Sequence, residues 1–384
     1  MNTTPVSFLD LAAMHAEVAD EVAAGFARVL DTCAFVGGPD VAEFEREFAA
    51  ASGRAHCVGL ANGTDAIELA LRAMGIGPGD EVVIPANTFI ATAEAIARAG
   101  AQPVLAEIDE KTMLVDTAAM EAAITPRTAA LVPVHLYGQL APMEEIQAVA
   151  RRHGLGVLED AAQAQLATRH GQGIGTGSVA AATSFYPGKN LGAYGDAGAA
   201  VTDDDAVAEQ IRLVANHGSP SKYVHTTLGF NSRLDTLQAV VLRAKLRRLE
   251  AWNELRRAAA DRYADLLTDT ELVLPAVAEG NVHVWHLYVV RVEVARRQVL
   301  IDGLTQAGIG TGIHYPAPVH LHQPFAALGT PGQFPIAERA ATEMVSLPMH
   351  PGLDPASQDR VAAAVRSSLA AADATGATGV VSAG

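Results

Sequence analysis

The sequence predicts an α/β fold, a mainly parallel and doubly wound sheet followed by a smaller C-terminal α+β domain. From residue 57 to about 215, short apolar runs alternate with stretches that have apolar residues at helical spacing. Such alternation is typical of parallel strands covered by helices on both faces. It stops near residue 213, and a long amphipathic helix follows over residues 236–267. A chain of 384 residues can bury two cores, so we place a boundary along this helix, with domains at 1–245 and 246–384.

The positions of the apolar runs predict the elements in order. Residues 11–30 and 41–50 have helical periodicity and predict an N-terminal arm and a first packing helix. Strands are expected at residues 57–60, 81–84, 103–108, 129–136, 155–158, 179–185 and 198–202, with helices such as 64–74 and 143–153 between them. The smaller domain should contain strands over 282–292 and up to 314–316, and helices at 298–307, 336–344 and 355–371. Residues 372–384 are small and polar and are expected to fray.

Composition narrows the class of protein. The net charge is −16, from 27 Lys and Arg against 43 Asp and Glu, which argues against sequence-independent nucleic-acid binding but allows a local site for an anionic small molecule. The two cysteines are too few for a disulfide framework and fit a reducing compartment. The first ten residues lack a signal-peptide pattern, and no apolar run has transmembrane length. We therefore expect a cytoplasmic enzyme that binds neither membranes nor nucleic acid.

One lysine stands where sheets of this kind bind ligands. Lys189 lies on a tight turn directly after the apolar run 179–185. Ligands collect beyond the carboxyl ends of parallel strands, so polar residues that follow such runs are candidates for a site. Asp160 ends another run, although a helix N-cap is by itself the more common role for such a residue. Lys189 and Asp160 are therefore the first pair of candidates.

Further candidates could hold a phosphate. The segment Asn62-Gly63-Thr64-Asp65 ends a strand and opens a helix, where free N–H groups and the helix dipole favour an anion; plain capping is an equally good explanation. Ser184 could add a second hydroxyl or simply end its strand, and Phe89 is either a ring beside a cofactor or a core residue. An amine, a carboxylate and a helix N-terminus with hydroxyls are together the parts that pyridoxal phosphate requires.

Other motifs fit less well. The Gly188-Lys189-Asn190 turn is not an ATPase phosphate loop, because Thr183 stands where the first glycine belongs and no Ser or Thr follows the lysine. The glycines of residues 171–177 follow no strand and open no helix, which favours a flexible loop over a dinucleotide site. We also expect no metal site, because no carboxylate or cysteine stands at ligand spacing from the paired histidines His283, His286, His320 and His322.

Ten segments together resemble the DegT/DnrJ/EryC1/StrS family of sugar aminotransferases. They follow one another in the order found in the family and extend over nearly the whole chain. The segments are ANGTDAIELAL, GIGPGDEVVIPANTF, AAITPRTAALVPVHLYGQ, LEDAAQA, SFYPGKNLGAYGDAGA, NHG, GFNSRLDTLQA, VWHLYVVR, IHYPAPVH and SLP. The resemblance implies a fold-type I transferase that uses pyridoxal phosphate and works as a homodimer with shared active sites.

The resemblance also implies roles for single residues. Lys189 would form the Schiff base and carry the proton, and Asp160 would hold the pyridine nitrogen. Gln163 would lie by the phenolic oxygen of the cofactor. The phosphate would be held by Thr64, Ser184 and the Gly63–Asp65 backbone, with Asn231 reaching it from the other subunit, and Phe89 would stack on the ring.

Two positions differ from the residues most frequent in the motifs of this family. Asn87 stands where phenylalanine is frequent, and Ala197 stands where glycine is frequent. Both are expected near the cofactor, and neither removes a group that the chemistry needs. Some relatives in this family are dehydratases with histidine in place of the lysine, so the presence of Lys189 argues for transamination.

The substrate expectation rests on two segments. IHYPAPVH and the loop HGSPSKYVHTT resemble the branch that aminates C3 of dTDP-linked 3-keto-6-deoxyhexoses, with L-glutamate as donor. The sugar pocket would then be lined by Tyr186, His314 and Tyr315, with Lys222 and Tyr223 from the partner subunit; loop and core packing is the alternative for these residues. Amination at C4 of a dTDP- or UDP-4-keto sugar, amination of a keto-inositol, and a regulatory protein that binds pyridoxal phosphate without turnover are the competing functions.

Overall fold

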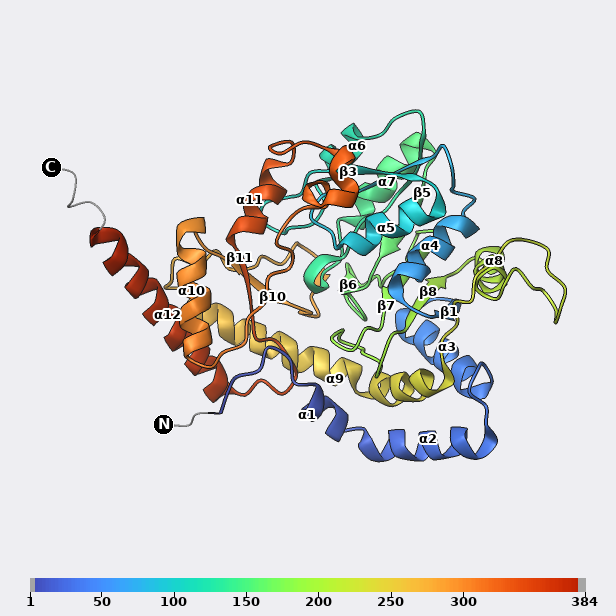
Figure 1. The fold of residues 1–384 in the computed structure, drawn as a ribbon, viewed down its shortest axis with the longest axis horizontal. Helices are drawn as coiled ribbons and strands as arrows, with labels where there is room; N and C mark the ends of the chain where they lie inside the picture. The colour runs from blue at the N-terminus through green and yellow to red at the C-terminus, as the bar shows by residue number, and fades with distance from the viewer. Residues whose placement is uncertain (1–3, 379–384) are drawn as a thin grey trace.

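A seven-stranded sheet forms the centre of the computed structural model, which describes residues 4–378 (Figure 1). The strand order is β1-β8-β7-β5-β4-β2-β3. Only β8 runs against its neighbours, and the pairs from β7 to β3 are all parallel. The bounds are β1 (His56–Leu60), β2 (Glu81–Pro85), β3 (Gln102–Ala106), β4 (Thr128–Leu131), β5 (Gly156–Asp160), β7 (Ala180–Ser184) and β8 (Gly198–Thr202). The predicted mainly parallel sheet is confirmed.

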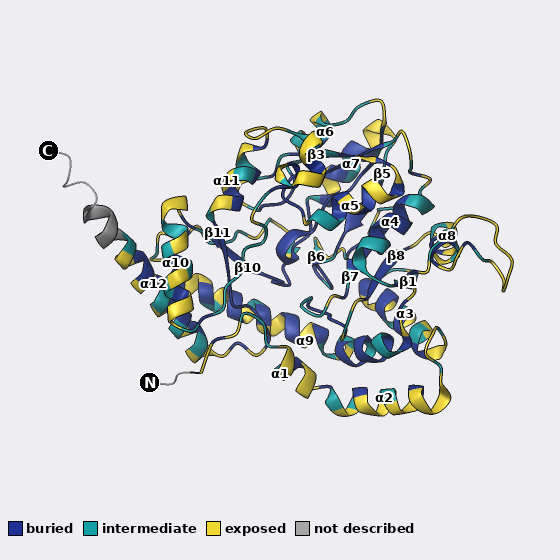
Figure 2. Ribbon diagram, viewed as in Figure 1, coloured by how far each residue is buried: buried dark blue, intermediate teal, exposed yellow. Residues whose placement is uncertain are grey.

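Helices cover both faces of the sheet, as the alternating pattern predicts. Val82 and Ile84 of β2 belong to a core with α4 (Gly63–Ala73), α5 (Ile90–Ala99) and α8 (Asp205–Ala215). Val83, between them, points to the other core, with α6 (Thr117–Ala122) and α7 (Met143–His153). The same opposite face carries α3 (Pro39–Ser52) near β1 and β8. Because side chains alternate along a strand, a run that is apolar throughout is buried on both sides, and Figure 2 shows the strands as buried.

The N-terminal arm is two helices instead of the single one expected over residues 11–30. They are α1 (Leu11–Ala16) and α2 (Ala19–Thr32). Val18 lies between them with non-helical dihedral angles and is buried against Val241 and Ala244 of α9 (Thr236–Leu267). The helix is therefore interrupted at the valine that packs on α9. The apolar periodicity of residues 11–30 does not reveal this contact.

The C-terminal third agrees less well with the sequence prediction. The expected strand over 282–292 is interrupted, with β9 (Asn281–Val282) and β10 (Tyr288–Arg291) at its ends. β10 pairs with β11 (Met344–Leu347), which follows α11 (Pro335–Glu343). The expected strand up to residues 314–316 is wrong, because Ile309 and Gly312 form only isolated bridges there. The interruption arises because Val284 and Leu287 donate backbone hydrogen bonds to the irregular segment at Gly138 and Tyr137.

The remaining elements complete the chain. They are β6 (Thr168–Arg169), which pairs with β9, α10 (Val294–Gln306), α12 (Pro355–Thr378), and the 3-10 turns η1 (Leu136–Gly138), η2 (Val319–Leu321) and η3 (Gln323–Leu328). Fraying was expected from residue 372, but α12 continues to Thr378; residues 379–384 lie outside the described part. No helix within residues 4–378 is long and apolar enough to cross a membrane.

A second core forms around the later turns of α9. It combines Tyr263 of α9 with residues of β10, α10, β11 and α12. Val6 also joins this core, because its backbone pairs with that of Ile309. The N-terminal segment thus packs against the C-terminal part, and the domain boundary near residue 245 stays a prediction.

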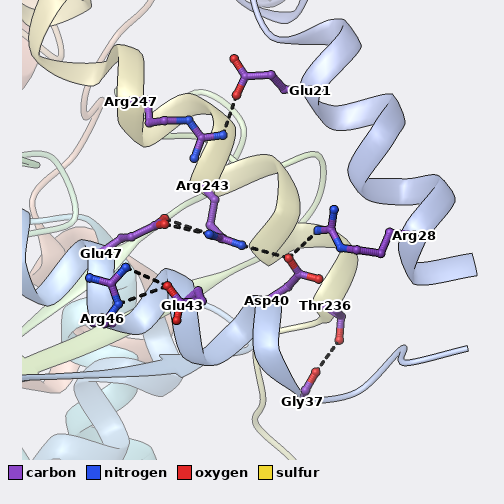
Figure 3. A network of polar contacts seen from close by, with 10 residues as sticks. All are labelled: Glu21, Arg28, Gly37, Asp40, Glu43, Arg46, Glu47, Thr236, Arg243 and Arg247. Carbon is purple, nitrogen blue, oxygen red and sulfur yellow. Dashed lines mark hydrogen bonds and ion pairs between the residues drawn. The ribbon is translucent and has the colours of Figure 1, made fainter. Parts of the chain in front are cut away.

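Ion pairs fasten α9 to the helices of the N-terminal part (Figure 3). The Arg243 guanidinium donates to Asp40 at 3.0 Å and to Glu47 at 2.8 Å, and Arg28 binds the same Asp40 at 2.6 Å. Asp40 is buried, so its charge depends on these partners.

We predict that Arg243→Met lowers the free energy of unfolding by about 1–2 kcal/mol, because it leaves the buried Asp40 with one cation. Arg46→Met is the matched control on α3: its exposed pair with Glu43 spans one turn, and no measurable change is expected. Urea denaturation of both variants tests this, and equal effects would contradict the role assigned to Arg243.

Candidate active site

A cavity of about 380 Å³ opens at the carboxyl ends of the central strands. It is the place where an open α/β sheet binds its ligand. Residues from widely separated segments share this cavity, and ten of the residues singled out from the sequence line it: Gly63, Thr64, Phe89, Asp160, Gln163, Ser184, Tyr186, Lys189, His314 and Tyr315.

Lys189 reaches the cavity from the turn after β7. Its backbone N–H donates to the Tyr186 carbonyl at 2.8 Å, which closes the turn. Burial lowers the pKa of the Lys189 amine from 10.5 to about 8, and the negative charge of Asp160 opposes part of this shift. Within the described residues, no hydrogen-bond partner is found for Lys189 Nζ. The amine is therefore unusually easy to deprotonate and is free to react.

The carboxylate of Asp160 is held in place at the end of β5. Thr92 Oγ1 donates to Oδ2 at 2.7 Å, and the Ala162 N–H donates to Oδ1 at 3.1 Å. Thr92 is itself hydrogen-bonded to Thr88 at 2.7 Å. Hydrogen bonds of this kind stabilise the charged form of a carboxylate, so Asp160 is suited to remain an anion beside a cation.

The N-terminus of α4 forms the opposite end of the cavity. Asn62 caps this helix by accepting from the Asp65 N–H at 2.8 Å. Gly63 lies against Ser184, where an added Cβ would approach the serine Cβ to 2.6 Å. A glycine is therefore required for α4 and β7 to approach this closely. Thr64 and Ser184 bring two hydroxyls to a helix N-terminus, which is a favourable place for an anion.

Aromatic and polar side chains form one wall of the cavity. The rings of Phe89 and Tyr315 are 5.1 Å apart, and Gln163 Nε2 donates to the Tyr315 hydroxyl at 2.9 Å. Gln163 Oε1 accepts from the Tyr137 N–H at 2.6 Å. Burial and the nearby Lys189 lower the pKa of His314 to about 4, so this imidazole is neutral near neutral pH.

Four of the predicted residues are not among those lining the cavity. The Asp65 carboxylate pairs with Arg98 at 3.1 Å, and its N–H is engaged by Asn62, so Asp65 is not available to a phosphate. Lys222, Tyr223 and Asn231 lie on or beside the loop between α8 and α9, which projects from the body (Figure 1).

The two departures from the family wording also lie outside the cavity. Asn87 donates to the Met113 carbonyl at 2.9 Å, and Ala197 is buried in the core beneath β7 and β8. Neither residue is among those that line the cavity, but each is next to one that does, Thr88 and Asp196, so the expectation that both lie near the cofactor stays a prediction.

Sequence reasoning missed several residues of the site. Thr92 and His286 lie 68 and 96 residues from their partners Asp160 and Asn190. Phe8, which stacks on His314 at 5.7 Å, comes from the N-terminal segment. Of these residues, only His286 could have been placed in the site from the sequence, because it lies in the family segment VWHLYVVR. Thr92 and Phe8 reach the site through tertiary contacts that the sequence does not reveal.

Comparison with known proteins agrees with this geometry. The profile of the DegT/DnrJ/EryC1/StrS aminotransferase family matches residues 17–366. The chain is 48% identical to dTDP-3-amino-3,4,6-trideoxy-alpha-D-glucose transaminase of Streptomyces venezuelae, over 95% of this chain and 96% of that protein. It is 49% identical to the erythromycin biosynthesis sensory transduction protein EryC1 of Saccharopolyspora erythraea, over 94% and 99%. The crystal structure of S. venezuelae DesV in complex with a ketimine intermediate matches with a TM-score of 0.93 and 48% identity, over 95% of this chain and 98% of that one.

The lowered pKa of Lys189 predicts how stability depends on pH. Between pH 8 and 10.5 this lysine binds fewer protons in the folded than in the unfolded state. Its burial therefore lowers the free energy of unfolding by the full amount below pH 8, and this loss disappears as the pH rises from 8 to 10.5. Lys189→Met should therefore stabilise the cofactor-free protein at pH 7, with the gain shrinking between pH 8 and 10.5.

Denaturant titrations at pH 7, 9 and 10 would measure this gain. Lys111→Met, at an exposed lysine outside the cavity, is the control and should give no pH-dependent difference. A gain from Lys189→Met that stays constant with pH would contradict the assignment.

Proposed function

This chain belongs to the DegT/DnrJ/EryC1/StrS aminotransferase family and is a pyridoxal-phosphate-dependent sugar aminotransferase. We propose that it transfers the amino group of L-glutamate to C3 of a dTDP-linked 3-keto-6-deoxyhexose. The observation that carries this proposal is the cavity shared by the Lys189 amine, the Asp160 carboxylate and the N-terminus of α4. Such a reaction belongs to the biosynthesis of deoxyaminosugars for antibiotics or glycans, and we propose that it takes place in the cytoplasm.

The cavity residues fit pyridoxal phosphate. Thr64, Ser184 and the first turn of α4 suit its phosphate, and Asp160 suits a protonated pyridine nitrogen. Phe89 offers a ring face, and Gln163 lies in the wall where we place the phenolic oxygen. When bound, the cofactor supplies a ring that withdraws electrons from the Cα–H bond of an amino acid.

Lys189 and Asp160 divide the chemistry between them. With a pKa of about 8, roughly a tenth of the Lys189 amine is neutral at pH 7 and about half at pH 8, so Nζ can take a proton from the donor Cα and return it. Asp160 must keep its charge throughout, and the hydrogen bonds from Thr92 and Ala162 favour the carboxylate form. The partial burial that lowers the pKa of the lysine also reduces the amount of water around its amine.

We place the sugar against Tyr186, His314 and Tyr315, which line the cavity, with His314 close enough to Lys189 for its charge to affect the imidazole. The neutral His314 can accept or donate a hydrogen bond to a hydroxyl without adding charge. Lys222 and Tyr223 would come from a second copy of the chain in a homodimer and meet the nucleotide, and Asn231 of that copy would reach the cofactor phosphate.

The names of relatives support C3 as the site of amination. The protein of S. venezuelae and one of Micromonospora megalomicea, each 48% identical to this chain, are both named dTDP-3-amino-3,4,6-trideoxy-alpha-D-glucose transaminases. Amination at C4 of a dTDP- or UDP-4-keto sugar and amination of a keto-inositol are the alternatives within the family.

A regulatory protein that binds pyridoxal phosphate without turnover is the alternative from another class. The name of EryC1, a sensory transduction protein, favours testing it. The absorbance spectrum of the purified protein separates the two: a cofactor band that L-glutamate converts to the amine form supports transamination, and a band that no amino donor changes supports a binding protein.

We predict that Lys189→Ala slows the conversion of the cofactor band by L-glutamate at least 10²- to 10⁴-fold, because it removes the acid–base group. Asp160→Ala should still bind the cofactor but convert it about 10²-fold more slowly, since the ring nitrogen loses its anion. Stopped-flow absorbance measures both rates, and Lys111→Ala serves as a surface control. Near-normal conversion by either cavity variant would remove that residue from its role.

The regiochemistry is a separate prediction. With L-glutamate and dTDP-linked 3-keto or 4-keto 6-deoxyhexoses as acceptors, we expect a 3-amino product, because the relatives named above are transaminases of 3-amino sugars. NMR of the isolated product locates the amino group through the coupling pattern of the proton on its carbon. A product aminated only at C4 would overturn the C3 assignment but leave the aminotransferase activity in place.

A further inference from the structure

The N-terminal segment forms part of the cavity wall. The Val6 N–H donates to the Gly308 carbonyl at 2.9 Å, and the Gly310 N–H donates to the Val6 carbonyl at 2.9 Å. An added Cβ at Gly310 would lie 2.8 Å from the backbone nitrogen of Phe8, so a glycine is required where the two segments approach. These contacts carry Phe8 and Leu9 to the cavity, and both residues line it.

The ring of Phe8 covers one face of His314. The two rings are stacked, with centroids 5.7 Å apart and planes inclined by 12°. This separation lies in the range of favourable aromatic pairs. Gly312 lies at the edge of both rings, because an added Cβ there would approach His314 Cε1 to 2.6 Å and Phe8 Cζ to 3.4 Å. The phenyl ring and the imidazole therefore pack together with no space for a side chain at position 312.

A hydrogen bond fixes one atom of the same imidazole. His314 Nδ1 is hydrogen-bonded to Ser346 Oγ at 2.8 Å, and Ser346 is fully buried. One hydrogen bond holds a ring atom in place but leaves the plane of the ring free to tilt, since the angular preference of such a bond is broad. The stacked ring of Phe8 restrains this tilt. Nε2 is then the ring nitrogen that remains for a ligand in the cavity.

We propose that Phe8 positions His314 for the acceptor sugar, so that the N-terminal segment is part of the substrate site. The inference rests on the proposed function, because it takes the sugar to meet His314. Phe8 acts through the imidazole and is a positioning residue. An imidazole that is held before the sugar arrives does not have to be ordered on binding, and such preorganisation increases affinity.

Two substitutions of Phe8 and a matched control separate stacking from packing. Phe8→Ala removes the ring, whereas Phe8→Leu keeps an apolar side chain but has no flat face for the imidazole. Phe26→Leu is the control. Phe26 is also a half-buried phenylalanine of the N-terminal part, but it packs with the cluster between α2 and α9 and does not line the cavity.

We expect Phe8→Ala to raise the KM for the dTDP-linked 3-keto-6-deoxyhexose about 10-fold, because the imidazole must be ordered when the sugar binds. Phe8→Leu should raise this KM about 3-fold, and kcat should change less than KM in both variants. Conversion of the cofactor band by L-glutamate alone should fall less than the reaction with the sugar, and Phe26→Leu should match the unchanged protein. An unaltered KM in Phe8→Ala, or equal losses with glutamate and with the sugar, would overturn the proposal.

NMR of ¹³C-labelled histidines tests the same contact without turnover. Burial lowers the pKa of His314 to about 4, and the charge of Lys189 lowers it further. Loss of the Phe8 ring admits water to one face of the imidazole, so in the cofactor-free protein Phe8→Ala should raise this pKa toward 6.5, with a smaller rise for Phe8→Leu. The His314 signal is identified by its absence in His314→Gln. A pKa of His314 that is the same in Phe8→Ala and in the unchanged protein would also refute the proposal.

Hydrogen exchange shows whether the N-terminal segment stays in place in the variants. The Gly310 amide donates to Val6, so its protection reports on this pairing. If Phe8→Ala loses this protection, the comparison of Phe8→Leu with Phe26→Leu decides. If the unchanged protein aminates no keto sugar, the proposed function falls, while the titration of His314 still decides whether Phe8 holds the imidazole.

Discussion

The structure depends on keeping an amine both partly desolvated and reactive. Lys189 is half-buried in the cavity beyond the end of β7, and its pKa falls to about 8 because desolvation outweighs the favourable charge of Asp160. An ion pair in contact with Asp160 would raise that pKa again and quench the base, whereas an exposed lysine would remain protonated near pH 10.5. The cavity therefore has to hold the two charges near each other without a salt bridge between them, and no such bridge is found among the described residues.

Much of this arrangement follows from local sequence. Polar residues that follow buried runs, such as Asp160 and Ser184, meet at one edge of a parallel sheet whatever the details of the connections. The helix N-terminus at Gly63 is likewise visible in the sequence, because a strand ends and a periodic stretch begins there. Lys189 stands out only when these neighbours are considered together. This part of the site could be predicted because it depends on strand order and strand ends, which apolar periodicity reveals.

The parts that could not be predicted are held by contacts across long stretches of chain. Thr92 reaches Asp160 from α5, and Val18 interrupts the N-terminal arm because it packs on α9. The strand β11 is not predicted, and its first residue, Met344, is expected to end a helix, because the pairing partner β10 lies more than fifty residues earlier. Short segments with mixed apolar and polar residues satisfy helix and strand patterns equally, and tertiary pairing decides between them.

The proposed substrate needs more positive charge than this cavity supplies. Among the described residues that line the cavity, Lys189 is the only lysine or arginine, and the chain as a whole carries −16. A nucleotide sugar brings two phosphate charges, which need cations that this cavity does not supply. Lys222 lies on the projecting loop beside Tyr223, whose side chain is 84% exposed. Val224 and Leu228 on the same loop are also exposed, at 49% and 86%, and a group of exposed apolar residues marks an interaction surface. These facts support the proposal that the loop of one subunit completes the site of another.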